Sequence, residues 1–98
     1  MNTDVYKALE DVFPKIVKLM PEKFDSHEFI LELAHKYQKL YIQALFEQKD
    51  KKKPFETVHK AIGKRLKKRV DLVKHVRDRS SKNIFGFANE VAFWHKVK

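Results

Sequence analysis

The chain of 98 residues has no cysteine, only two glycines and no long apolar run. Without cysteine, the sequence excludes a disulfide scaffold, a cysteine-ligated zinc finger and a thiol nucleophile. No stretch approaches the ~18 consecutive apolar residues that a membrane-spanning helix needs, so we expect no membrane segment. The N-terminus lacks the basic start and apolar core of a secretory signal. We therefore expect a cytoplasmic protein.

The scarcity of glycine also limits tight turns, and the chain contains no Asn-Gly or Asp-Gly pair of the kind that closes β-hairpins. Apolar residues instead recur at steps of three and four, which is the period of an amphipathic helix. The sequence therefore predicts an all-α fold. We expect one small domain over residues 1–98, a three- to four-helix bundle with a long central helix.

The first two helices carry clear boundary signals. A helix is predicted over residues 4–20, kinked or split at Pro14, because proline removes a backbone donor and crowds the preceding turn. In the stretch "FDSHEF", Asp25 is a good N-cap and Glu28 follows three residues later, as in a capping box. This signal predicts the long central helix over residues 26–48.

The second half of the chain has the same helical period. Valines, Ile62 and Leu66 predict an amphipathic helix over residues 55–79, opened by Pro54 at its first turn. A short last helix is predicted over residues 88–97. The residues expected in the core are Phe29, Leu33, Tyr37, Leu40, Ile62, Leu66, Val70 and Trp94.

Charge is unevenly distributed along the chain, whose formal net charge is +9. Residues 1–48 contain six lysines and eight acidic residues, a net charge of −2, whereas residues 49–98 contain sixteen Lys or Arg and five acidic residues, a net charge of +11. On a helical wheel of the predicted helix 55–79, lysines occupy the side opposite the apolar stripe and arginines occupy its flanks. The candidate phosphate-binding residues are Lys51, Lys52, Lys53, Lys60, Lys64, Arg65, Lys67, Lys68, Arg69 and Lys74.

Two interpretations of this basic face stay open. Such a face can neutralise phosphates, with Arg65 and Arg69 as possible contributors to specificity. Charged outer faces of helices are also common as plainly solvated surfaces. A standard helix-turn-helix centred on Gly63 is rejected, because His59 and Lys64 occupy positions where that motif has a small and an apolar residue.

Other chemistry has little support in the sequence. The histidines show no spacing typical of a metal site, and we expect neither a metal nor a cofactor. No phosphate-binding loop and no nucleophile beside a base are recognisable, so we expect no enzymatic activity. The aromatic residues near the C-terminus can stack on unpaired bases when exposed, but more often belong to a core.

The most favoured function is therefore a small basic module that binds nucleic acid, DNA or RNA, through its phosphate backbone. The alternative is a non-enzymatic interaction module or accessory subunit. In that case the basic face would meet an acidic protein partner, or the chain would self-associate as a homodimer in which Phe87 and Trp94 complete a shared core.

Overall fold

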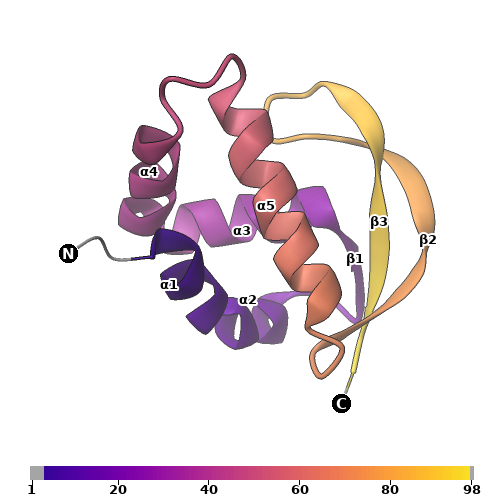
Figure 1. The fold of residues 1–98 in the computed structure, drawn as a ribbon. Helices are drawn as coiled ribbons and strands as arrows, with labels where there is room; N and C mark the ends of the chain where they lie inside the picture. Colours follow the sequence, from indigo (N-terminus) through magenta and orange to yellow (C-terminus); the bar gives the residue numbers. More distant parts are fainter. Residues whose placement is uncertain (1–3, 98) are drawn as a thin grey trace.

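The computed structural model describes residues 4–97 and combines helices with a sheet (Figure 1). Its helices are α1 (Val5–Asp11), α2 (Phe13–Leu19), α3 (Ser26–Lys36), α4 (Gln38–Glu47) and α5 (Pro54–Lys68). Its strands are β1 (Lys23–Asp25), β2 (Val73–Lys82) and β3 (Ala88–Lys96). The predicted all-α bundle is therefore wrong, and the fold is mixed α/β.

The first predicted helix is split, as the proline indicated. Asp4 caps α1 by accepting the backbone N–H groups of Tyr6 and Lys7. The helix ends at Asp11, and Pro14 lies in the first turn of α2, where its missing N–H costs nothing. The break lets Leu9 and Phe13 turn into the same core.

The capping box before α3 is confirmed. Glu28 donates its backbone N–H to Asp25 at 2.9 Å, and Asp25 donates its own N–H to the Glu28 side chain at 2.9 Å. The single helix predicted over residues 26–48 is wrong, because the chain bends at Tyr37 and continues as α4. A straight helix of that length would extend about 34 Å. The bend instead returns α4 to pack on α1 and α5.

The predicted helix over residues 55–79 ends early. α5 stops at Lys68, a short turn follows, and β2 begins at Val73. Valines at steps of three are compatible with a helix, but β-branched residues also favour strands, and pairing with β3 decides between the two. The predicted helix over residues 88–97 is wrong for the same reason, since this segment is β3.

The sheet has the order β1-β3-β2 and both pairings are antiparallel. β3 is central, and its Trp94 lies opposite Phe24 on one side and His75 on the other. A bulge interrupts β2 between His75 and Arg77. In the connecting loop, the Asn83 side chain accepts the N–H groups of Phe85 and Phe87.

One core joins the helices to the inner face of the sheet. Five of the predicted core residues are buried, namely Phe29, Leu33, Ile62, Leu66 and Trp94. Tyr37 and Leu40 are half-buried against this core. Val70 is 76% exposed, so its assignment to the core is wrong. It lies in the turn after α5, beyond the helical stripe that it was expected to continue.

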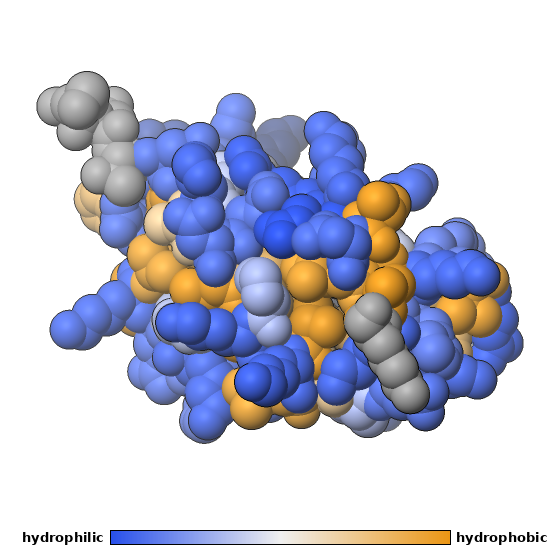
Figure 2. All heavy atoms as spheres, turned by 90° about the horizontal axis from the view of Figure 1, so that it is seen from below, coloured by the Kyte–Doolittle hydropathy of each residue, from blue (hydrophilic) through white to orange (hydrophobic). Residues whose placement is uncertain are grey.

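The end of the molecule near that turn is partly apolar. Figure 2 views the molecule from below Figure 1 and shows apolar surface between hydrophilic residues. Exposed apolar side chains also occur elsewhere, on α3, α4 and the loop between β2 and β3. The described helices include none that is long and apolar enough to cross a membrane.

The hairpin β2–β3 is fastened to α3 by an ion pair between Arg79 and Asp25. The guanidinium donates to Asp25 Oδ2 at 2.8 Å and to Glu28 Oε1 at 3.1 Å, and it lies 4.0 Å from the centre of the Phe93 ring. The Asp25 residue is only 1% exposed. Burial alone would raise its pKa, but hydrogen bonds from the Glu28 backbone, Ser81 and Arg79 outweigh burial and lower it.

We predict that Arg79→Met lowers the free energy of unfolding by about 2 kcal/mol at pH 7, because it leaves a buried carboxylate without its cation. The folded-state pKa of Asp25 lies below the ordinary value of 3.8. Its contribution is therefore present above that value and is lost as the pH falls through the folded-state pKa. Urea denaturation at neutral and acidic pH measures both effects.

Arg77→Met is the matched control. Arg77 lies over the same Phe93 ring at 5.3 Å and has no ion pair among the described residues. Equal losses of stability in the two variants would contradict a special role for the Asp25 pair.

Candidate functional site

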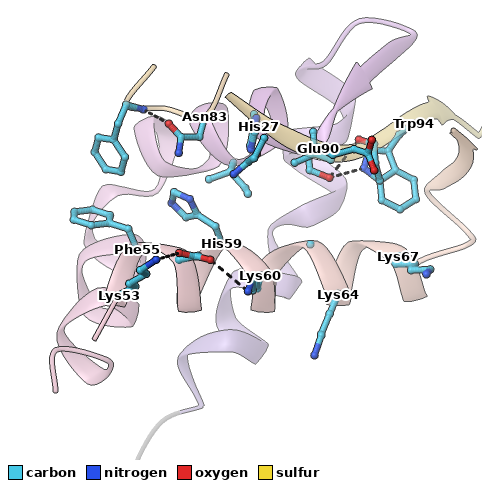
Figure 3. A pocket seen from close by; sticks show the side chains of 18 residues that line it. His27, Lys53, Phe55, His59, Lys60, Lys64, Lys67, Asn83, Glu90 and Trp94 are labelled. Carbon is cyan, nitrogen blue, oxygen red and sulfur yellow. Dashed lines mark hydrogen bonds and ion pairs between the residues drawn. The ribbon is translucent and has the colours of Figure 1, made fainter. Parts of the chain in front are cut away.

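A cleft of about 480 Å³ opens between α5 and the hairpin β2–β3, with the start of α3 at its base (Figure 3). Its volume is in the range of ligand-binding pockets. Three segments far apart in the sequence form it: residues 26–30, residues 53–67 and residues 83–94. This arrangement depends on the hairpin, which the sequence-based prediction placed in helices.

Aromatic side chains close the end of the cleft near the start of α5. Phe55 of α5 meets Phe85 of the hairpin loop edge to face, with ring centres 4.6 Å apart. The His59 ring lies nearly parallel to the Phe85 ring, with centres 6.4 Å apart. Phe85 is 49% exposed, and Gly86 supports its loop with a φ of 87°, a conformation that favours glycine. About half of the Phe85 residue is therefore accessible to a ligand.

The base of the cleft is mostly apolar but contains a polar group that the protein leaves unsatisfied. Ile30, Ala92 and Trp94 line it, and the Trp94 indole donates to Ser26 Oγ at 3.0 Å. His27 also lines the cleft and is only 7% exposed. Its Nδ1 is buried and has no hydrogen-bond partner among the described residues. Such groups are uncommon in folded proteins because each costs about 1–3 kcal/mol.

His59 is held by a short hydrogen bond to Tyr41. The Tyr41 Oη and His59 Nε2 atoms lie 2.6 Å apart. Burial raises the pKa of Tyr41 to about 12, so its hydroxyl keeps its proton. Burial, and to a smaller extent the electrostatic effect of His27, lower the pKa of His59 to about 4. At neutral pH both partners of this hydrogen bond are therefore uncharged, and the tautomer of the imidazole sets which of them donates.

Lysines form the α5 side of the cleft. Lys60, Lys64 and Lys67 follow one another along the helix, with Lys53 just before its start. Figure 3 shows Lys64 extending from α5 on the side that faces away from the hairpin. Glu56 pairs with Lys53 at 3.7 Å and with Lys60 at 3.4 Å. Four lysines and two glutamates line the cleft, so its formal net charge is +2 with the histidines neutral.

The remaining candidate residues lie around this lysine row rather than in the cleft. Lys51 and Lys52 are exposed in the connector before α5, and Lys68 is exposed at the end of α5. Lys74 is exposed on β2, on a different element from the one predicted. Only part of the predicted lysine set therefore lines the cleft, and the other lysines lie outside it.

Both candidate arginines bind acids on the opposite flank of α5. Arg65 donates to Glu10 of α1 at 3.0 Å, and Arg69 lies 3.5 Å from the same carboxylate. Arg69 also makes paired hydrogen bonds of 3.0 Å to Asp71. These arginines fasten α5 to α1 and to the following turn, so their geometry favours a structural role.

Sequence reasoning missed the histidines, Asn83 and Phe85 as members of one site. His27 and His59 lie on different helices, and only the packing of α3 against α5 brings them together. The signal that was present is the Asn83-to-Gly86 turn, which separates apolar and β-branched stretches and is compatible with a hairpin. No group of three or more potential metal ligands is found among residues 4–97.

Comparisons of the chain with protein-family models, with curated proteins and with solved structures find no match. The argument for function therefore rests on the site itself.

We predict that unfolding stability falls as the pH is lowered from about 6.5 toward 4, because the unfolded chain protonates His59 while the folded chain resists it. The loss is up to about 3 kcal/mol. His59→Phe should remove this part of the pH dependence. Chemical denaturation at several pH values measures it, and an NMR titration gives the midpoint for the His59 ring directly.

Equal pH dependence in the wild type and His59→Phe would contradict the prediction. An NMR midpoint for His59 near 6.5 would contradict it independently, without relying on the stability of the variant.

Proposed function

We propose that the protein binds nucleic acid through the lysine row of α5, defined as Lys60, Lys64 and Lys67, together with the lysines of the preceding connector. The observation that carries the proposal is the position of this row beside an aromatic cleft. A basic surface beside exposed aromatic rings is the combination that proteins use to hold phosphates and bases together.

The distribution of charge supports a polyanionic ligand. Lys60 and Lys67 are separated by about 10 Å along the helix axis, since a helix rises about 1.5 Å per residue. Lys68 and the connector lysines extend the basic surface beyond the cleft at both ends of α5. A ligand with repeated phosphates can contact the whole length of this surface, whereas a single anion cannot. Release of condensed counterions then supplies much of the affinity.

The ion pairs of Arg65 and Arg69 limit the proposed phosphate-binding residues to the lysines. Their guanidinium groups already have carboxylate partners, so phosphate binding is assigned to the lysines and not to the arginine flank. The cytoplasmic location expected from the sequence stays a prediction.

We predict that the triple variant Lys60→Gln, Lys64→Gln, Lys67→Gln weakens binding of a fluorescein-labelled oligonucleotide at least about tenfold at low salt. The slope of log affinity against log salt should also become shallower by about 2 to 3, because three phosphate contacts are lost. Fluorescence anisotropy at several salt concentrations measures both quantities.

The control is Lys15→Gln, Lys36→Gln, Lys39→Gln, which removes the same charge from exposed positions on α2, α3 and α4. The proposal fails if both triple variants behave alike, or if the wild type shows no salt-dependent binding to DNA or RNA.

Self-association is a second candidate, favoured by a different surface. A shallow groove at the junction of α3 and α4 is flanked by Leu31 and Ile42, which are 56% and 60% exposed. The earlier expectation that Trp94 completes a shared core is wrong, because Trp94 is buried within this chain. Phe87 stays exposed.

If this second candidate holds, the wild type should sediment as a dimer at micromolar concentration, and Leu31→Lys combined with Ile42→Lys should give a monomer. Burying two lysine charges in a closely packed apolar interface would weaken dimerisation by several kcal/mol. A wild-type monomer at all concentrations tested in analytical ultracentrifugation would exclude it.

A further inference from the structure

We propose that the cleft between α5 and the hairpin receives one unpaired base of a single-stranded nucleic acid, while the adjacent lysines hold its backbone. The inference rests on the proposed function and makes it more specific, since it distinguishes single strands from duplexes. Within the cleft, three independent features of the described residues point to this ligand.

The first feature is a stacking surface. Phe55 and Phe85 are both partly exposed and meet at one end of the cleft, and His59 continues the aromatic wall. A base has an apolar flat face that stacks on such rings, and stacking is tolerant of base identity. An alkyl chain would gain less from this geometry, because it has no flat face to match the rings.

The second feature is polar capacity in the lining of the cleft that the described residues leave unused. The Nδ1 atom of His27 has no hydrogen-bond partner among residues 4–97, and because that atom is itself buried, a ligand pairs with it only when the His27 ring turns toward the cleft. Asn83 uses its side-chain oxygen to accept two backbone N–H groups, so its amide nitrogen is the group that can reach a ligand. Asn89 adds a second amide to the lining. Nucleobase edges carry both donors and acceptors and can pair with groups of this kind.

The third feature is the charge state of the cleft interior. His59 is neutral at pH 7 and Tyr41 keeps its proton, so neither places a full charge beside the aromatic wall. The charged groups of the lining are the lysines along α5 and two glutamates, Glu90 and Glu56, of which Glu56 pairs with Lys53 and Lys60. A nucleotide has the same division, with an uncharged base on one side of the sugar and a phosphate on the other.

Duplex nucleic acid fits this cleft less well. Bases stacked within a duplex present only their edges to the grooves, and a flat face becomes available only after the base leaves the stack. Extruding a base from a duplex costs a few kcal/mol, and this cost is smallest for a base that is already single-stranded. The cleft therefore predicts that single strands bind more tightly than duplexes of the same sequence.

The experiment uses single-stranded DNA and RNA of about eight nucleotides with the fluorescent base 2-aminopurine at the centre, and the corresponding duplexes. The wild type should bind the single strands at least about tenfold more tightly than the duplexes, and 2-aminopurine fluorescence should change on binding. Comparison of the DNA and RNA forms shows which sugar the site accepts.

Phe85→Leu and Phe55→Leu should each weaken single-strand binding about tenfold, because stacking on an aromatic ring contributes about 1–3 kcal/mol per base. The salt slope and the duplex affinity should stay unchanged, since both variants retain every lysine. The matched control is Phe46→Leu on α4, where the ring is 65% exposed and outside the cleft. Thermal melting of each variant verifies that it is folded.

Two results distinguish a failure of the base pocket from a failure of the proposed nucleic-acid binding. Salt-dependent binding that is equal for single strands and duplexes, and that is insensitive to Phe55→Leu and Phe85→Leu, overturns the base pocket and leaves nucleic-acid binding in place. No binding to any of the probes overturns the proposed function and, with it, the base pocket.

Discussion

The buried carboxylate of Asp25 connects the parts of this molecule on which the cleft depends. It is the last residue of β1, the N-cap of α3 and the acceptor for Arg79 of β2. A carboxylate that is almost fully buried is stable only when its oxygens are hydrogen-bonded and its charge is paired. These requirements fix the start of α3 relative to the hairpin. Since α3 forms the base of the cleft and the hairpin forms one wall, the same interactions set the shape of the candidate site.

The opposite wall is held by separate interactions. α5 buries Val58, Ile62 and Leu66 in the core, and its arginine flank pairs with Glu10 of α1. This arrangement uses the arginines for structure and leaves the lysines facing solvent and the cleft. Lysine is well suited to phosphate contacts that need no fixed geometry, whereas the planar fork of arginine is better suited to a defined carboxylate partner. The two kinds of basic residue thus have different roles on one helix.

Features that depend on neighbouring residues could be predicted from the sequence, whereas features that depend on distant segments could not. The capping box at Asp25 and Glu28, the split at Pro14 and most of the core residues were correctly predicted, because each depends on neighbours within one or two turns of chain. The sheet was missed because its strands are far apart in sequence. β1 pairs with β3 across roughly seventy residues, from Phe24 to Trp94. The valines of β2 fitted a helical period equally well, and no local signal could decide between the alternatives.

The sequence by itself determined the basic second half, the amphipathic character of α5 and the absence of cysteine chemistry, since these are properties of composition and local order. Only the tertiary structure decided that the hairpin lies beside α5, that His27 and His59 share a cleft with Phe55 and Phe85, and that Arg65 and Arg69 pair with Glu10 of α1. The physical reason is that strand pairing and buried ion pairs depend on contacts between distant segments. Those contacts exist only once the chain has folded around one core.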